Sequence, residues 1–338
     1  MKEAYLYERI EDEKIRCNLC SHRCKIALDK RGICQVRQNS GAKLYSLVYG
    51  RLISRNVDPI EKKPLFHFLP GSRSYSIATV GCNFRCLHCQ NWQISQYPRL
   101  NNGEIVGEQA TPEEIVQDAL ISGAKSISYT YVEPTIFFEM AYETGKIARS
   151  RGIKNIFVSN GYMTPETNKM LTEFLDGINI DLKAFTDRFY KEVCKARLQP
   201  VLDSIKQLHE AGIWVEVTTL IIPGWNDSEE ELRDIARFIK GVSESIPWHV
   251  TAFHPTYKMM DRPPTPVSIL RRAREIGLEE GLRFVYEGNI PGEGGENTYC
   301  PACKAVLISR YGFSILENRL GEDGRCPECG EEIQGVWK

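Results

Sequence analysis

The chain has 338 residues, of which 42% are hydrophobic and 26% are charged, and its net charge at neutral pH is −1. The near-neutral charge excludes a broad electrostatic attraction to nucleic acid or to a membrane surface. Residues 1–30 carry charges and cysteines in place of an apolar signal core, and no apolar run approaches the roughly 18 residues of a membrane span. We therefore expect a cytoplasmic protein with a catalytic domain and small additions.

Twelve cysteines divide the chain into three parts. Clustered cysteines without an export signal indicate metal binding more than disulfides. We expect a four-cysteine lead-in module over residues 1–70, a central domain over 71–295 and a C-terminal module over 296–338. Cys194 stands alone, and a buried or incidental thiol is its default interpretation. The other cysteines form an N-terminal group (Cys17, Cys20, Cys24, Cys34), a triplet (Cys82, Cys86, Cys89) and a C-terminal group (Cys300, Cys303, Cys326, Cys329).

The N-terminal cysteine group has the spacing C-x2-C-x3-C-x9-C. Its four thiolates could fill a zinc site or a complete iron–sulfur cluster, and we favour zinc. About twenty extended residues connect the group to the first strand of the central domain and could span it. We therefore expect one shared metal in a lobe beside the open mouth of the domain. The alternative is a stabilising plug on its bottom face.

Strand and helix signals alternate through the central domain. β-Branched and aromatic runs predict strands at residues 76–80, 126–131, 155–159, 177–181, 213–221, 248–253 and 283–286. Helical patterns lie between them at residues 136–151, 165–175, 201–211, 229–240 and 267–280, and another helix begins at Thr111 with a capping box. This alternation predicts an α/β fold with parallel strands, either a doubly wound sheet or a (β/α) barrel.

Polar residues follow most of the predicted strands. In a (β/α) barrel the carboxyl ends of the strands build the active site. The alternative is that loops are simply polar, but a recurring set of such residues at successive strand ends weakens it. The set comprises Glu133, Asn160, Asp181, Lys183, His254 and Asn289.

The cysteine triplet follows the first strand of this domain with the spacing C-x3-C-x2-C. Three thiolates are one short of a fully protein-held [4Fe–4S] cluster, so one iron could bind a small molecule. The alternative is a zinc knuckle completed by His88 or by a distant ligand.

Residues 81–91, which read GCNFRCLHCQN, resemble the cluster motif of radical S-adenosylmethionine (SAM) activases of the pyruvate formate-lyase activating enzyme type. The resemblance covers about residues 65–292 and includes DLK at 181–183, FHP at 253–255 and GN at 288–289. It implies a partial (β/α)6-type radical SAM barrel, a [4Fe–4S] cluster on the triplet and reductive cleavage of SAM to a 5′-deoxyadenosyl radical. The family usually has GGEP after its second strand, whereas this chain has YVEP at 131–134.

The resemblance also implies which residues contact SAM. His88, Cys89 and Gln90 would lie on the adenine side. Glu133 would bind the amino group. Asp181 and Lys183 would contact polar groups of SAM, and His254 its ribose or carboxylate. Asn160 and Asn289 complete the expected cofactor-binding set.

The whole chain resembles the radical SAM member of the three-component AmmeMemoRadiSam system. That resemblance includes the N-terminal cysteines, the phrase YTYVEPT at 129–135 and the C-terminal cysteine pairs. It implies AMMECR1-like and Memo-like companions, and radical SAM chemistry implies an external flavodoxin- or ferredoxin-like electron donor.

The C-terminal cysteine group has two C-P-x-C pairs at the spacing of a zinc ribbon. We expect a zinc there, because a segment this short cannot fold on a core of its own. A rubredoxin-like iron or an auxiliary cluster is the alternative. We also expect this module to be separable, so that truncation near Glu296 leaves the barrel intact.

The sequence is compatible with three functions. The first is a glycyl-radical-type activase that removes hydrogen from a partner protein. The second is radical modification of a small molecule, peptide or side chain together with the companions. The third is a non-catalytic metal-binding adaptor, which the combination of the triplet with Asp181, Lys183 and His254 disfavours.

Overall fold

The computed structural model describes residues 1–11, 13–290 and 292–338. Its centre is an eight-stranded sheet in the order β16-β15-β14-β13-β12-β11-β9-β8, in which all strands are parallel except the edge strand β8. The strands are β8 (Ser54–Pro59), β9 (Arg73–Ala78), β11 (Ser126–Tyr129), β12 (Lys154–Ser159), β13 (Gly177–Asp181), β14 (Trp214–Ile221), β15 (Trp248–Ala252) and β16 (Val285–Gly288).

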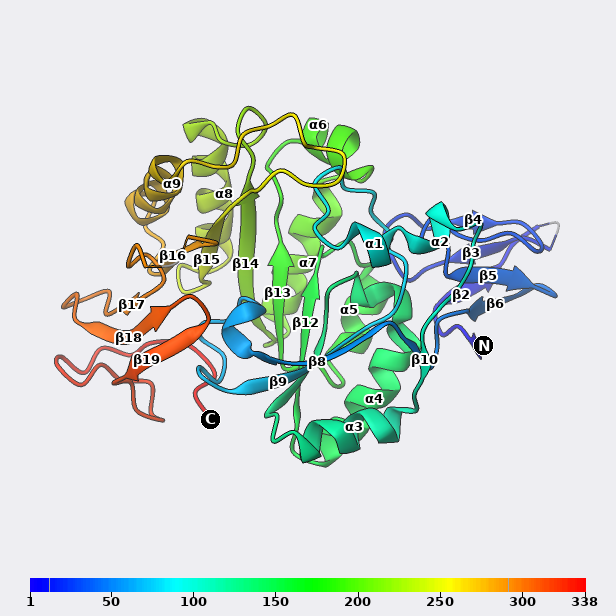
Figure 1. Cartoon of the computed structure of the whole chain (residues 1–338), viewed down its shortest axis with the longest axis horizontal. Helices are drawn as coiled ribbons and strands as arrows, with labels where there is room; N and C mark the ends of the chain where they lie inside the picture. Colours follow the sequence, from blue (N-terminus) through cyan, green and yellow to red (C-terminus); the bar gives the residue numbers. More distant parts are fainter. Residues whose placement is uncertain (12, 291) are drawn as a thin grey trace.

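Helices connect successive strands and form a layer outside the sheet (Figure 1). They are α3 (Pro112–Ile121), α4 (Phe138–Ser150), α5 (Pro165–Leu171), α7 (Gln199–Glu210), α8 (Glu229–Val242) and α9 (Val267–Glu279). The capping box predicted for α3 is present, since Thr111 accepts from the Glu114 amide and the Glu114 carboxylate accepts from the Thr111 amide. This repeated strand–helix unit confirms the predicted α/β fold, a partial barrel of parallel strands with helices outside.

Shorter elements shape the loops around the barrel. They are η1 (Ile60–Lys62), α1 (Trp92–Ser95), α2 (Tyr97–Leu100), η2 (Pro134–Phe137), α6 (Asp187–Phe189), the π-helical η3 (Tyr190–Cys194), and the paired strands β7 (Arg51–Leu52) and β10 (Glu108–Gln109). Most of these helical turns follow the carboxyl end of a strand, so the irregular structure is concentrated where the candidate site lies.

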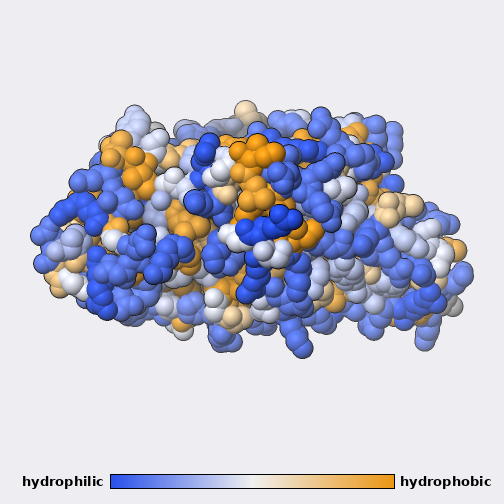
Figure 2. Space-filling view, turned by 90° about the horizontal axis from the view of Figure 1, so that it is seen from below, coloured by the Kyte–Doolittle hydropathy of each residue, from blue (hydrophilic) through white to orange (hydrophobic). Residues whose placement is uncertain are grey.

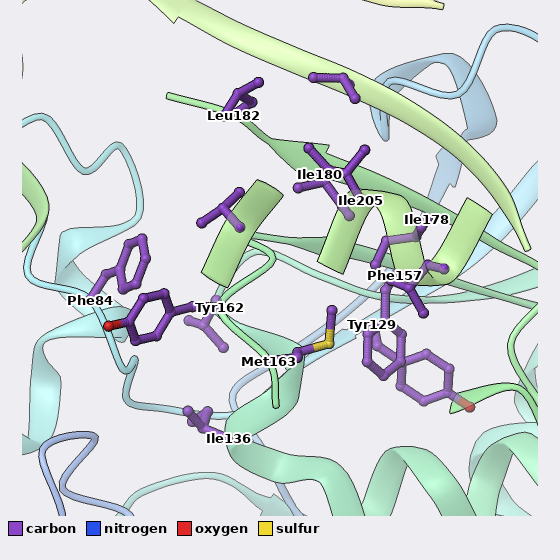
Figure 3. Packing of buried hydrophobic residues seen from close by; sticks show 14 of the residues in the cluster. Phe84, Tyr129, Ile136, Phe157, Tyr162, Met163, Ile178, Ile180, Leu182 and Ile205 are labelled. Carbon is purple, nitrogen blue, oxygen red and sulfur yellow. The ribbon is translucent and has the colours of Figure 1, made fainter. Parts of the chain in front are cut away.

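The hydrophobic core lies between the sheet and its helices. Tyr129, Phe157, Ile178 and Ile180 are fully buried, and Figure 3 shows them packed with Ile205 of α7. The strands are buried along nearly their whole length, but apolar residues alternate in them with buried polar ones such as Ser74, Ser126 and Asn179. This rigid core holds the carboxyl ends of the strands at one edge.

The N-terminal module consists of two small three-stranded sheets, β1-β6-β5 and β2-β3-β4. Cys20 forms a β-bridge with Met163 after β12, and the Ser21 amide donates to the Tyr162 carbonyl at 3.0 Å. The module therefore packs beside the carboxyl ends of the strands, on the mouth side of the barrel as expected. Its strands are β1 (Lys2–Glu3), β2 (Tyr7–Arg9), β3 (Ile15–Cys17), β4 (Lys25–Ile26), β5 (Arg37–Ser40) and β6 (Lys43–Ser46).

The C-terminal module, with β17 (Thr298–Tyr299), β18 (Val306–Tyr311) and β19 (Ser314–Asn318), lies at the opposite end of the molecule (Figure 1). It shares a hydrophobic cluster with Phe66, Phe284 and Tyr286 of the barrel. Buried Arg310 also donates to the Phe66 carbonyl at 2.9 Å. The expectation of a separable module does not fit this packing, because truncation near Glu296 would expose these aromatic rings.

Hydrophilic side chains predominate on the face of the molecule shown in Figure 2, and hydrophobic ones gather there in separate groups. Within the described residues, none of the helices has the length and apolar character needed to cross a bilayer.

Candidate active site

The cysteine triplet lies in the loop between β9 and α1. Cys86 is buried, and Cys82 and Cys89 are half-buried. The loop begins at Gly81, whose φ of +99° and whose approach to the Val36 side chain leave no room for a Cβ atom. The amides of Arg85 and Leu87 donate to carbonyls of η3 at 3.0 and 3.1 Å. These contacts present all three thiols at the carboxyl end of β9.

Burial and neighbouring charges raise the pKa values of the thiols in the triplet. Burial raises the pKa of Cys82, and the charges of Glu133, Cys86 and Cys89 raise it further. The pKa of Cys86 is raised by a hydrogen bond with the Cys194 thiol and by burial. Burial also raises the pKa of Cys89, whose sulfur lies 3.3 Å from the Ser95 hydroxyl. Metal binding at these thiols must therefore release protons.

Cys194 is a neighbour of the triplet that the sequence did not identify. It is fully buried at the end of η3, and its thiol contacts that of Cys86. A lone cysteine more than a hundred positions away in the chain carries no spacing signal, so only the packing of η3 against the loop brings the two together.

Glu133 follows β11 and is 3% exposed. Its Oε1 accepts from the Thr135 amide at 3.1 Å, the Thr135 hydroxyl and the Ser159 hydroxyl at 2.8 Å, and its Oε2 accepts from the Asn160 amide at 2.8 Å. Burial raises the pKa of Glu133, and these donors oppose that rise. Since Oε1 is saturated, the remaining acceptor capacity is on Oε2.

Asp181 and Lys183 form an ion pair at the end of β13, with 2.8 Å between Lys183 Nζ and Asp181 Oδ2. The lysine side chain is 13% exposed and that of the aspartate 37%. Burial lowers the pKa of Lys183, but the charges of Asp181 and Cys86 outweigh it and leave the pKa well above its usual value. The Lys183 side chain, which lies beside the triplet, therefore stays protonated.

The other predicted residues lie around the same edge of the sheet. The His88 ring is buried, and burial together with the Lys183 charge lowers its pKa to about 3, so the ring is neutral. The side chain of Asn160 donates from Nδ2 to Asn83 Oδ1 at 2.8 Å, which connects β12 to the triplet loop. Gln90, His254 and Asn289 are exposed, and Asn289 donates to the Ala252 carbonyl at 2.9 Å.

Two polar atoms near these groups lack partners. Among the described residues, the buried His88 Nδ1 and Thr218 Oγ1 accept and donate no hydrogen bond, and Thr218 lies opposite Asp181 in the sheet. Buried polar atoms without partners are rare and are often satisfied by a ligand. Three thiols beside a charged pair and unsatisfied polar atoms suit a metal cluster with one open position and a small polar ligand.

The outer cysteine groups differ in their geometry. The C-terminal sulfurs lie within 4.8 Å of one another, with Cys300 and Cys329 at 3.6 Å and Cys303 and Cys326 at 3.7 Å. The N-terminal group instead lines one cavity. Its members are Cys17, Cys20, Cys24 and Cys34.

Comparison with known proteins identifies the central segment. Residues 76–239, from β9 to the last turns of α8, match the model of the radical SAM superfamily. The chain belongs to the radical SAM superfamily. Membership implies a [4Fe–4S] cluster and SAM as the cofactors of this radical SAM chain.

This radical SAM chain is also similar to individual relatives and to solved structures. It is 49% identical to an uncharacterized protein of Methanocaldococcus jannaschii, over 99% of this chain and all of that protein. It is 23% identical to the pyruvate formate-lyase-activating enzyme of Clostridium pasteurianum, over 64% of this chain and 93% of that enzyme. Among solved structures, Streptococcus suis SuiB bound to SAM is similar in fold, with a TM-score of 0.51 at 16% identity, covering 68% of this chain and 53% of that one.

Proposed function

We propose that Cys82, Cys86 and Cys89 hold the [4Fe–4S] cluster of this radical SAM enzyme. When bound there, the cluster supplies the electron that cleaves SAM to the 5′-deoxyadenosyl radical, which abstracts hydrogen from a substrate. The observation that carries the proposal is the convergence of three thiols from one loop with the Asp181–Lys183 pair at the carboxyl edge of the parallel sheet.

The surrounding residues would hold SAM in a fixed orientation. Charged Lys183 suits the SAM carboxylate, and the free capacity of Glu133 Oε2 suits its amino group. His88 and Gln90 are the chain neighbours of Cys89 on the proposed adenine side, while His254 and Asn289 are exposed at neighbouring strand ends. Asn160 would act by fixing Asn83 and Glu133 in place.

For the substrate, a glycyl-radical-activase-like reaction on a partner protein is the first candidate. It is supported by the distant similarity to an enzyme named as a pyruvate formate-lyase activator. The required electron would come from a flavodoxin- or ferredoxin-like protein.

The second candidate is radical modification of a small molecule, a peptide or a side chain, in the AmmeMemoRadiSam system with AMMECR1-like and Memo-like companions. The observation that favours it is coverage: the activating enzyme aligns over nearly all of its own length but covers only 64% of this chain. The extra parts of this chain would then serve a partner or substrate that the activator lacks.

The C-terminal cysteine group would bind a structural zinc. A tetrahedral zinc with Zn–S bonds of about 2.3 Å holds its sulfurs about 3.8 Å apart. The separations of 3.6 and 3.7 Å fit that geometry.

The test of SAM cleavage uses the anaerobic full chain with dithionite and SAM, and it measures 5′-deoxyadenosine. Cys82→Ala, Cys86→Ala and Cys89→Ala should each abolish the product, because each removes one ligand. Cys194→Ala is the matched control, since it removes a buried thiol that adjoins Cys86 without being a proposed ligand. Full activity in any variant of the triplet would refute the assignment.

The two substrate candidates can be separated by electron paramagnetic resonance. The activase candidate expects a stable glycyl radical on a partner when the complete reaction is frozen. If an AMMECR1-like or Memo-like protein instead raises turnover or gains a mass change without that signal, the second candidate is correct.

A further inference from the structure

The N-terminal cysteine group encloses a small cavity at the junction with the barrel. All four cysteines line it, and its other wall comes from Asn83, Thr135 and Ile136. Asn83 directly follows Cys82 in the chain, and Thr135 and Ile136 come shortly after Glu133. The cavity is therefore formed jointly by the N-terminal module and by the loops that carry the candidate active site.

The spacing of the four thiols distinguishes them from the C-terminal group. The C-terminal sulfurs all lie within 4.8 Å of one another, as a single metal ion requires, and in the described part of the chain no such compact set forms among the N-terminal sulfurs. The triplet, which lies wholly in that part, does not form one either. In a cubane cluster each thiolate binds a different iron, so its sulfurs are held further apart than those around one ion. By this measure the N-terminal group resembles the triplet.

The walls of the cavity suit an anionic group that is shielded from water. Leu19, Ile26 and Ile33 contribute apolar side chains. The backbone amides of His22, Ile33 and Val36 are directed at the thiols of Cys20, Cys24 and Cys34. Such N–H donors to ligand sulfurs are typical of iron–sulfur sites and help to set their potentials.

Two buried donors on residues that line the cavity have no partner. Arg37 is 2% exposed and Asn83 1%, and neither Arg37 Nε nor Asn83 Nδ2 donates a hydrogen bond to any described residue. The other guanidinium nitrogens of Arg37 are bonded to Glu139, at 2.9 and 2.6 Å. A buried N–H without a partner destabilises the fold, and an anionic group bound in the cavity would accept from both donors.

We propose that Cys17, Cys20, Cys24 and Cys34 bind a second [4Fe–4S] cluster, in place of the zinc that the sequence favours. Because all four irons have a cysteine ligand, this cluster has no open position and does not bind SAM. The site lies where the N-terminal module meets the triplet loop, since the carbonyl of Asn83, which lines the cavity, lies 2.9 Å from His22 Nε2. This site is independent of the function proposed above, since it concerns different thiols.

The experiment leaves the N-terminal module intact and removes the triplet. The full chain with Cys82→Ala, Cys86→Ala and Cys89→Ala combined is reconstituted anaerobically and analysed for iron, acid-labile sulfide and zinc, and by Mössbauer spectroscopy. We expect about four irons and four sulfides per chain, in a cluster whose spectrum does not change when SAM is added. The wild-type chain should contain about twice as much iron.

A second variant assigns the cluster to its thiols. Adding Cys17→Ala and Cys20→Ala to the triple variant should remove the remaining iron and sulfide, while the zinc content stays as it was. The proposal is overturned if the triple variant contains no iron and binds a second zinc. It is also overturned if that variant contains no metal beyond that of the C-terminal group. Iron that survives the additional substitutions overturns it too.

Discussion

The two outer cysteine groups have the same number of thiols but differ in where they lie and in how they are spaced. The C-terminal sulfurs form a compact set near the amino ends of the strands, on a module that shares aromatic residues with the barrel. The N-terminal sulfurs surround a cavity beside the carboxyl ends of the strands, where the candidate active site lies. Four cysteines in a sequence therefore do not specify one kind of site, because the surrounding packing decides how far apart the thiols are held.

The largest expected effect comes from the C-terminal group. Cys300→Ala removes a fully buried thiol from the compact set, and we expect the loss of the proposed zinc and of at least ~5 kcal/mol of stability, since structural zinc binding contributes about 10–16 kcal/mol in small domains. Zinc content and chemical denaturation measure this. The exposed Ala302→Ser in the same loop is the control and should behave as wild type. A zinc-free variant of unchanged stability would show that the shared aromatic core alone holds the module.

The attachment of the N-terminal module can be tested at its buried ion pair. Glu139→Gln leaves the Arg37 guanidinium buried without a counter-charge, which should cost about 3–5 kcal/mol. The control is Glu166→Gln, which breaks the exposed pair with Arg23 and should cost less than ~1 kcal/mol. Urea denaturation compares the two. Equal effects would mean that the module is not held by its buried contacts.

Between the two modules, the barrel itself is expected to bind SAM. Lys183→Ala removes a charged contact but no proposed metal ligand, so SAM affinity should fall about 10- to 100-fold while iron content remains normal. Anaerobic calorimetry and iron analysis measure the two quantities. The exposed Lys146→Ala on α4 is the matched control. Loss of iron together with affinity would instead assign Lys183 to the integrity of the cluster.

The smallest effect concerns pH at the C-terminal interface. His67 is fully buried against Gln334 and Tyr286, and burial lowers its pKa to about 4. Below about pH 6.5 the unfolded chain binds a proton at this ring that the folded chain does not, so stability should fall as pH decreases from 6.5 towards 4. The contribution is at most about 1.4 kcal/mol per pH unit.

The variant His67→Gln should remove this part of the pH dependence. Denaturation at pH 7.5 and at pH 5.5 measures the slope for both proteins. An unchanged slope in a folded variant would show that His67 does not keep its neutral form at this interface.

Much of the barrel followed from local patterns in the sequence. Alternating strand and helix signals predicted the parallel strands, because hydrophobic periodicity and capping residues act over a few positions. The triplet was predicted from its cysteine spacing and its place after the first strand. That Glu133, Asp181 and Lys183 would lie near it followed from parallel strands, which bring their carboxyl ends to one edge.

Other features depended on tertiary structure. Cys194 contacts Cys86, Arg37 pairs with Glu139 across 102 positions, and Phe66 joins the core of the C-terminal module. None of these has a local signal, because each results from packing between segments that are remote in the chain. The same reason separates the two outer cysteine groups: their spacing along the sequence indicated metal in both, but only the folded structure set the distances between their sulfur atoms.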